Sequence, residues 1–295
     1  MMKADTRSLA PRSYLFVPGN RPERFDKALA SGADALILDL EDSVPMAEKA
    51  VARHAVSDWL SRVKTSTSLF VRINTLSSPL HAEDLNALRH TPMTGVVLPK
   101  CEGVDDLLTL DRVLSELEQL SGRTLRSVAV IAIATETARS MQRIHTFEGD
   151  IPRLHGILWG AEDLATSLGA RSLRDRQGNY TATALYARDA ALFASHACGV
   201  GAIDAVFTGL DDATGLEAET RAHAALGFTA KAAIHPAQIA VIHQAQQPSD
   251  DDLAWAMEVV AELEDGAKSS GRVRGSMVDQ PHLNAARRIL RHTRT

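Results

Sequence analysis

Short apolar runs of the kind that form buried β-strands recur along most of this 295-residue chain, and stretches with helical spacing separate most of them. The runs are SYLFVPG (about 13–19), ALILDLED (35–42), LFVRIN (69–74), GVVLPK (95–100), VAVIAIAT (128–135), HGILWGAED (155–163), AIDAVFTG (202–209) and TAKAAIHP (229–236). Strands that alternate with helices form right-handed βαβ units and a parallel sheet. Eight such units favour a closed (β/α)8 barrel over an open sheet.

We therefore predict an α/β fold, a (β/α)8 TIM barrel over residues 12–247, followed by a C-terminal helical arm over 248–295. The arm would contain a helix near 249–269, a glycine-containing joint (SSGRVRGS) and a last helix near 281–293. The polar stretch 165–183 separates the sixth strand from its helix, which makes it a candidate active-site loop or lid.

Composition narrows the class of protein. The formal net charge of −5 argues against non-specific nucleic-acid binding, and no nucleic-acid motif is recognisable. The two cysteines, Cys101 and Cys198, lie far apart, which favours a reducing compartment and argues against a cysteine-based zinc site. The first 13 residues lack an apolar leader core, and no apolar run approaches the roughly 18 residues of a membrane span. We expect a cytoplasmic protein without a membrane partner.

Polar side chains gather where the predicted strands end. They are Asp39, Glu41, Asp42, Arg72, Lys100, Glu136, Glu162, Asp163 and His235. In a (β/α)8 barrel the carboxyl ends of all eight strands converge on one face, and the chemistry of such barrels takes place there. Residues far apart in the sequence are therefore expected to meet at one site.

Glu136 and Asp163 have the chemistry of ligands for a hard cation. Magnesium takes oxygen ligands and often only one or two protein carboxylates, with water and substrate filling the remaining positions. Zinc would need His or Cys at suitable spacing, which the sequence does not offer. The alternative is that Glu136 begins a helix and Asp163 caps one, since acids are common at both places.

Asp39, Glu41 and Asp42 place three acids within four residues at a strand end. Like charges this close are costly unless cations compensate them, and a metal, or Arg and Lys from neighbouring strands, would do so. Arg72 lies in a run that should be buried, so it needs a partner. Its planar fork fits a carboxylate through two hydrogen bonds, and that carboxylate is either the substrate's or one of these acids.

Lys100 ends the fourth strand. A Schiff base there would make the protein a metal-free aldolase, but we favour a lysine that neutralises the acids after the second strand. His235 could shuttle protons, or it could bond to the backbone at a turn. Arg21 and Arg24 lie where a Gly-containing turn meets a helix N-terminus, which suits an anion, although an ordinary solvated helix would look the same.

Eight segments, taken in order, resemble one family. They are YLFVPGNRPERFDKA, LILDLEDSV, FVRIN, VVLPK, IATETA, GAEDLA, KAAIHPAQI and GSMVDQP. The chain resembles the citrate lyase β-subunit-like family of the HpcH/HpaI aldolase group, which is related to malyl-CoA and citramalyl-CoA lyases, from about residue 12 to 293. The resemblance implies a TIM barrel that assembles as a homotrimer or hexamer. It also implies that Glu136 and Asp163 bind Mg²⁺, for which Mn²⁺ could substitute, and that Arg72 holds the carboxylate of a 2-oxo acid.

The same resemblance implies roles for residues outside the metal site. Phe16, Arg21 and Arg24 would lie near the CoA end of the substrate, with the two arginines as candidate phosphate contacts. Asp279 would be the acid placed over a neighbouring subunit's site. We assign Glu41 and Asp42 to the catalytic group with Asp279 and Arg72, and Lys100 to substrate binding.

The implied activity is Mg²⁺-dependent carbon–carbon cleavage of a 3-hydroxy-carboxyacyl-CoA, such as citramalyl-, malyl- or citryl-CoA, to acetyl-CoA and a 2-oxo acid. Three alternatives remain open: a citrate lyase β subunit acting on an acyl-carrier-protein thioester, an aldolase acting on free hydroxy-oxo acids, and a non-catalytic barrel that binds metal and oxo acid.

Overall fold

The computed structural model describes residues 11–263 and 269–291, and its backbone clusters into two compact units that divide between Ile242 and His243. Residues 1–10, which belong to the segment without an apolar leader core, lie outside the described range, as do 264–268 and 292–295 of the predicted arm. That the chain folds as separate domains, divided after residue 247, stays a prediction. Within the described residues, no helix is both long and apolar enough to cross a membrane.

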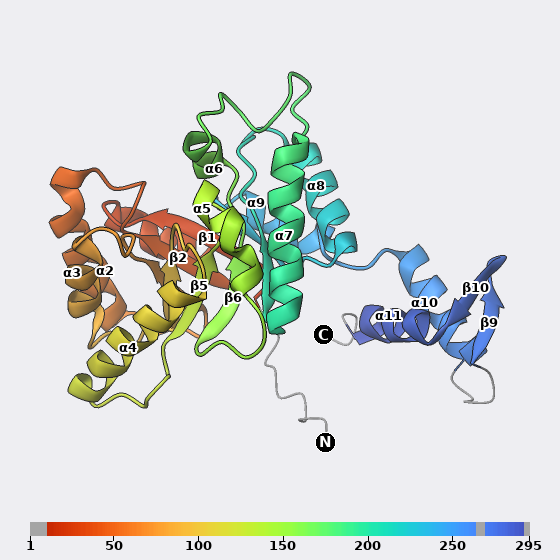
Figure 1. Cartoon of the computed structure of the whole chain (residues 1–295), viewed down its shortest axis with the longest axis horizontal. Coiled ribbons are helices and arrows are strands. Elements are labelled where there is room, and N and C mark those ends of the chain that lie inside the picture. The colour runs from red at the N-terminus through yellow and green to blue at the C-terminus, as the bar shows by residue number, and fades with distance from the viewer. Residues whose placement is uncertain (1–10, 264–268, 292–295) are drawn as a thin grey trace. The chain divides into compact units, whose positions relative to one another are not determined.

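The first unit is a closed barrel of eight parallel strands, each hydrogen-bonded to its neighbours in sequence order, with β8 closing onto β1 (Figure 1). The strands are β1 (Ser13–Pro18), β2 (Ala35–Asp39), β3 (Ser68–Arg72), β4 (Gly95–Leu98), β5 (Ala129–Ile133), β6 (Leu154–Leu158), β7 (Gly201–Asp204) and β8 (Ala230–Ala233). This confirms the predicted (β/α)8 TIM barrel. Every strand ends earlier than its apolar run suggested, because the last residues of each run belong to the loops over the barrel mouth.

Helices surround the barrel (Figure 1). They are α1 (Phe25–Leu29), α2 (Lys49–Arg62), α3 (Leu80–Leu88), α4 (Val104–Ser121), α5 (Ala138–Arg143), α6 (Glu162–Ser167), α7 (Ala182–Cys198), α8 (Ala213–Leu226) and α9 (Gln238–Ala245), with short 3₁₀ turns at Pro22–Arg24, Met46–Glu48 and Ile144–Thr146. The predicted strand 155–163 is corrected here, since β6 stops at Leu158 and α6 already begins at Glu162. The polar segment between α6 and α7 is a loop over residues 168–181.

Side chains of each strand alternate between the barrel interior and the helix layer. The interior cluster contains Tyr14, Ala35, Ile37, Phe70, Val97, Ile131, Ile133, Leu158, Ile203, Ala230 and Ala232, all buried. The residues between them pack outward against the helices in a larger cluster. The barrel interior is therefore a filled core, and the polar residues that the sequence singled out lie at or just beyond the carboxyl ends of the strands.

The second unit contains α10 (Asp250–Leu263), the strands β9 (Ser270–Val273) and β10 (Ser276–Asp279), and α11 (Gln280–Arg291). The segment predicted as a glycine-containing joint is corrected here, because it forms an antiparallel hairpin of β9 and β10. Arg274 and Gly275 make its two-residue turn, both with positive φ (48° and 84°), which is the geometry that twisted hairpins favour. Apolar side chains of α10, the hairpin and α11 form a small core of their own.

Candidate functional site

Arg72 and Asp39 form a buried ion pair at the mouth of the barrel. The Nε and Nη2 groups of Arg72 donate to the two carboxylate oxygens of Asp39, each at 2.6 Å, and both side chains are largely buried. Burial favours a neutral Asp39, but the charge and hydrogen bonds of Arg72 outweigh it and hold the pKa of that carboxyl below its usual range. The Arg72 guanidinium also lies over the Phe16 ring, 5.1 Å from its centroid. Of the two partners that the sequence left open for Arg72, the structure contains the acid.

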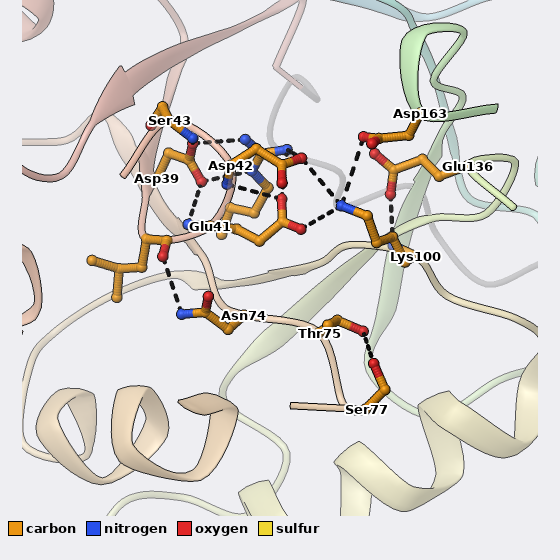
Figure 2. A network of polar contacts seen from close by, with 12 residues as sticks. Asp39, Glu41, Asp42, Ser43, Asn74, Thr75, Ser77, Lys100, Glu136 and Asp163 are labelled. Atoms are coloured by element: carbon orange, nitrogen blue, oxygen red, sulfur yellow. Dashed lines mark hydrogen bonds and ion pairs between the residues drawn. The ribbon is translucent and has the colours of Figure 1, made fainter. Parts of the chain in front are cut away.

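Glu41, Asp42 and Lys100 extend this pair into a network (Figure 2). Arg72 Nη1 lies 3.2 Å from Glu41, and the Lys100 ammonium contacts Glu41, Asp42 (3.1 Å) and Asp163 (3.7 Å). The predicted compensation of the three acids by Arg and Lys is therefore present. Burial lowers the pKa of Lys100, but its carboxylate neighbours, Glu41 first, raise it above its ordinary value overall. A Schiff-base lysine needs a lowered pKa, so this geometry disfavours one.

Glu41 is a carboxyl of this group whose pKa is raised. Burial raises its pKa to about 6, although Arg72 and Lys100 both act in the opposite direction. The neighbouring Asp42 is more exposed, and its pKa lies below the ordinary value, because the hydrogen bond from Glu41 and the charge of Lys100 outweigh its partial burial. The pKa values of two adjacent carboxyls are therefore shifted in opposite directions, that of Glu41 upward and that of Asp42 downward. This arrangement suits Glu41 to proton transfer near neutral pH.

Glu136 is held by the backbone of Lys100. Lys100 has a left-handed conformation (φ 51°), which directs its N–H to a carboxylate oxygen of Glu136 at 2.6 Å. Burial raises the pKa of Glu136, which is only 4% exposed, to about 8. Immediately after it, Thr137 caps α5 through a reciprocal pair of hydrogen bonds with Ser140. A cation beside this carboxylate would stabilise its charged form.

Asp163 lies in the first turn of α6, with its side chain 32% exposed and directed to the same ammonium as Glu41 (Figure 2). The backbone of Gly160 passes so close to Glu136 that a β-carbon there would lie 3.1 Å from Glu136 Cγ. One buried and one partly open carboxylate, with a glycine keeping space beside the buried one, suit a hard divalent cation that retains positions for water and substrate. Glu136 and Asp163 could hold Mg²⁺ in this way.

A hollow of about 380 Å³ adjoins the network, between the loops that follow β3, β4 and β5. Its polar lining consists of three hydroxyl groups, two carboxylates and one ammonium group, from Thr75, Ser77, Thr137, Glu102, Asp106 and Lys100. Because Lys100 and Thr137 belong both to this lining and to the surroundings of Glu136, the hollow opens next to the candidate metal site.

Within the described residues, four that the sequence singled out are not part of this network: Arg21, Arg24, His235 and Asp279. Arg21 and Arg24 are exposed at the turn that follows β1. His235 is exposed, and its Nδ1 accepts a hydrogen bond from the Ala237 N–H at 3.2 Å, which matches the turn alternative. Asp279 ends β10 in the second unit, and its carboxylate lies 2.5 Å from Nδ1 of His282, a partner that sequence reasoning missed.

Sequence reasoning also missed a buried ionic cluster at the end of β7. The ligand atoms of Asp204, Glu219 and His223 lie within 4.8 Å of one another. The ammonium of Lys231, on β8, donates to Asp204 at 2.5 Å and to Glu219 at 3.0 Å, so this lysine already supplies a positive charge between the two carboxylates. Asp204 and Lys231 were visible as charged residues inside apolar strand runs, which was the available signal.

Comparison with known proteins places this chain in a family. Residues 12–236 match the family model described as HpcH/HpaI aldolase/citrate lyase. The chain is 39% identical to a citrate lyase subunit beta-like protein of Mycobacterium tuberculosis, over 94% of both chains, and 31% identical to the mitochondrial citramalyl-CoA lyase of Mus musculus, over 95% of this chain and 85% of that one.

Solved structures give the same result. The crystal structure of CitE from Mycobacterium tuberculosis in complex with magnesium, acetoacetate and coenzyme A matches with a TM-score of 0.82 and 37% identity, over 97% of this chain and 98% of that one. A complex of the same protein with magnesium and pyruvate matches with a TM-score of 0.73 and 35% identity, over 96% of this chain and 99% of that one. The chain belongs to the HpcH/HpaI aldolase/citrate lyase family.

Proposed function

We propose that this protein is a Mg²⁺-dependent carbon–carbon lyase that cleaves a 3-hydroxy-carboxyacyl-CoA to acetyl-CoA and an oxo acid. The observation that carries the proposal is the convergence of Glu136 and Asp163 on Lys100 at the barrel mouth, next to the Arg72 network. Support comes from the similarity over nearly the whole chain to a protein that crystallised with magnesium, acetoacetate and coenzyme A.

Glu136 and Asp163 would hold the metal. When bound, Mg²⁺ supplies a Lewis acid that favours the substrate alkoxide and polarises the nascent keto oxygen. Two of the donor groups of Arg72 are committed to Asp39, so a substrate carboxylate would meet the Nη1 edge, which faces Glu41 at 3.2 Å. Arg72 would then orient the substrate from a position that Asp39 keeps rigid.

Glu41 suits the role of base, because burial raises its pKa to about 6 and its carboxylate lies against the Lys100 ammonium. In the forward direction Glu41 takes the proton of the substrate hydroxyl, and the oxygen becomes a ketone as the adjacent carbon–carbon bond breaks. The electron pair of that bond passes to the thioester fragment as an enolate. A carboxylic acid then protonates the enolate carbon, giving acetyl-CoA. Asp279 is our choice for this acid, acting from a neighbouring subunit of a homotrimer or hexamer.

Several oxo acids are candidates for the second product of the cleavage. Acetoacetate, pyruvate and oxaloacetate have each been crystallised with the Mycobacterium protein or its citrate lyase β subunit. A cleavage screen of four thioesters identifies the oxo acid that this protein releases. Malyl-, citramalyl-, citryl- and 3-hydroxy-3-methylglutaryl-CoA would give glyoxylate, pyruvate, oxaloacetate and acetoacetate respectively, each together with acetyl-CoA.

Calorimetry with CoA, followed by this cleavage screen, tests the proposal against its alternatives. CoA binding with Mg²⁺-dependent release of acetyl-CoA supports the lyase. Cleavage of a free hydroxy acid without CoA binding favours an aldolase, and cleavage of only an acyl-carrier-protein thioester favours a citrate lyase β subunit. Binding of metal and oxo acid with no cleavage of any substrate identifies a non-catalytic barrel and overturns the proposal.

A further inference from the structure

The indole of Trp159 connects the candidate metal site to the buried cluster at the end of β7. Trp159 directly follows β6 and is fully buried, and its Nε1–H donates to Asp204 Oδ1 at 2.7 Å. The neighbouring Ile203 points into the barrel, so Asp204 faces the helix layer, where Trp159 meets it. The bond therefore ties the loop after β6 to the wall of the barrel behind it.

Asp204 is a rigid anchor for this bond. Its Oδ1 also accepts from the Ala205 N–H at 2.9 Å, and its Oδ2 accepts from Lys231 at 2.5 Å and contacts His223 at 2.8 Å. Burial opposes the charged form, but Lys231 and His223 hold the pKa of Asp204 well below its usual range. A fully buried carboxylate with four such partners cannot turn without breaking several of them.

On its other side, Trp159 packs against the loop 168–181. The Tyr180 ring meets the indole edge-on, with centroids 5.1 Å apart, and the Arg174 guanidinium covers Tyr180 at 3.7 Å. Arg174 also bonds to Glu219, which shares Lys231 with Asp204. The loop that interrupts the sixth barrel unit is thus fastened to the same cluster from two directions.

The turn that begins at Trp159 positions both carboxylates of the candidate metal site. The next residue, Gly160, lies against Glu136, and its N–H donates to Thr135 Oγ1 at 3.0 Å. Asp163 follows in the first turn of α6, and Ser167 at the end of that helix accepts from the Ala138 N–H, two residues after Glu136. A shift of the indole would therefore move the backbone that positions Asp163 relative to Glu136.

We propose that Trp159 is a positioning residue for the metal site: its hydrogen bond to Asp204 sets the distance between the Glu136 and Asp163 carboxylates. The inference rests on the proposed function only in taking these two residues as the metal ligands. Groups that hydrogen-bond to the ligands of a metal typically control its affinity by 10- to 100-fold, and Trp159 acts one step further back, through the turn that joins it to Asp163. Trp159 would act in this way without touching either the metal or the substrate.

The chain offers a closely matched control in Trp59. Its Nε1–H donates to Asp26 Oδ1 at 2.8 Å, and its ring meets Phe25 edge-on with centroids 5.4 Å apart. Trp59 is also buried, on α2. Trp159→Phe and Trp59→Phe therefore remove the same kind of hydrogen bond from the same kind of aromatic pair, and only the first change affects the turn beside Glu136.

The experiment measures Mn²⁺ binding to the substrate-free protein by electron paramagnetic resonance and calorimetry, together with urea unfolding. Trp159→Phe is expected to weaken Mn²⁺ binding about 10-fold, while Trp59→Phe lowers stability and leaves the Mn²⁺ dissociation constant unchanged. Thr135→Val, which removes the second tether of the same turn, should weaken Mn²⁺ binding in the same direction, and it decides the matter if Trp159→Phe does not fold.

Unchanged Mn²⁺ affinity in a folded Trp159→Phe protein overturns the positioning role and leaves the proposed lyase intact. Equal weakening in the two tryptophan variants also overturns it, because it would report general loosening of the barrel. Absence of Mn²⁺ binding to the wild-type protein contradicts the metal site itself, and with it both proposals.

Discussion

The backbone N–H of Lys100 donates to a carboxylate oxygen of Glu136 at 2.6 Å, so one residue joins the two halves of the site. The side chain of the same lysine reaches across the barrel mouth to Glu41 and Asp42 (Figure 2). A left-handed backbone at Lys100 allows both contacts at once. The candidate metal ligand and the candidate base are therefore held by a single residue, the first by its backbone N–H and the second by its side-chain ammonium.

Replacing either carboxylate of the metal site should abolish metal-dependent turnover. Glu136→Gln and Asp163→Asn remove the charges that a hard cation requires, while the barrel core remains unchanged. Glu162→Gln is the control, because Glu162 is exposed and directly precedes Asp163 on α6. Cleavage assays with EDTA, and then with added Mg²⁺ or Mn²⁺, measure the effect. Full activity in EDTA, with covalent trapping by borohydride, would contradict the metal and support a Schiff base at Lys100.

Arg72→Lys keeps the charge and loses the fork that holds Asp39 through two hydrogen bonds. Loss of one charge-assisted hydrogen bond costs roughly 1.5–3 kcal/mol, or about 10- to 100-fold in kcat/KM. Arg53→Lys is a matched control, because Arg53 bonds to the buried Asp84 at 2.9 Å in the helix layer. We expect both variants to lose stability and only Arg72→Lys to lose oxo-acid binding and turnover, with CoA binding kept. Equal weakening of oxo-acid and CoA binding would show that Arg72 is a scaffold residue.

Asp279→Asn should be inactive as a homogeneous protein, because the enolate carbon would lose its proton donor. If Asp279 acts on a neighbouring subunit, the Asp279→Asn protein can be mixed with inactive Glu136→Gln protein. Subunit exchange in the mixture then regenerates some sites with both residues intact. Recovered cleavage activity, with exchange followed by mass spectrometry of labelled subunits, measures this. A mixture that exchanges and stays inactive contradicts the shared site. A fully active Asp279→Asn protein removes Asp279 from the mechanism and leaves it as the partner of His282.

Glu118 should stabilise the fold near neutral pH and lose this contribution in acid. It accepts hydrogen bonds from Arg153 and from backbone N–H groups of Arg126 and Val128. Burial opposes its charge, but these donors hold the pKa of Glu118 at about 2, against an ordinary value of 4.5. Because the folded pKa is lowered, the stabilisation is fully present above pH 4.5 and disappears as the pH falls toward 2. The difference between the two pKa values corresponds to roughly 3 kcal/mol.

Urea unfolding of the wild type and Glu118→Gln between pH 7 and pH 2 measures this contribution. The wild type should be more stable at pH 7, and the difference should shrink below pH 4.5. Glu116→Gln, an exposed change on the same helix, should make no difference at any pH. A constant gap between the wild type and Glu118→Gln down to pH 2 would contradict the low pKa of Glu118.

Much of the barrel could be predicted from local pattern, because buried parallel strands are continuous apolar runs and their polar ends mark the mouth. The same logic predicted that Glu136, Asp163, Arg72 and Lys100 would lie together, as they do in the structure. It failed at the hairpin of the second unit, where Arg274 adopts a left-handed turn that arginine rarely takes. Tertiary contacts support that turn, since the Arg274 guanidinium bonds to Asp251 at 2.7 Å and Glu258 at 3.0 Å on α10.

By itself, the sequence determined the order of strands and helices in the barrel and the set of acids and bases at the strand ends, because both follow from periodicity along the chain. Only the tertiary structure decided which charges pair. Asp39 faces Arg72 in the register between β2 and β3, and Asp204 faces Lys231 in the register between β7 and β8. Register depends on how all eight strands close into a barrel, so an ion pair between strands is a property of the closed sheet and cannot be read from either strand alone.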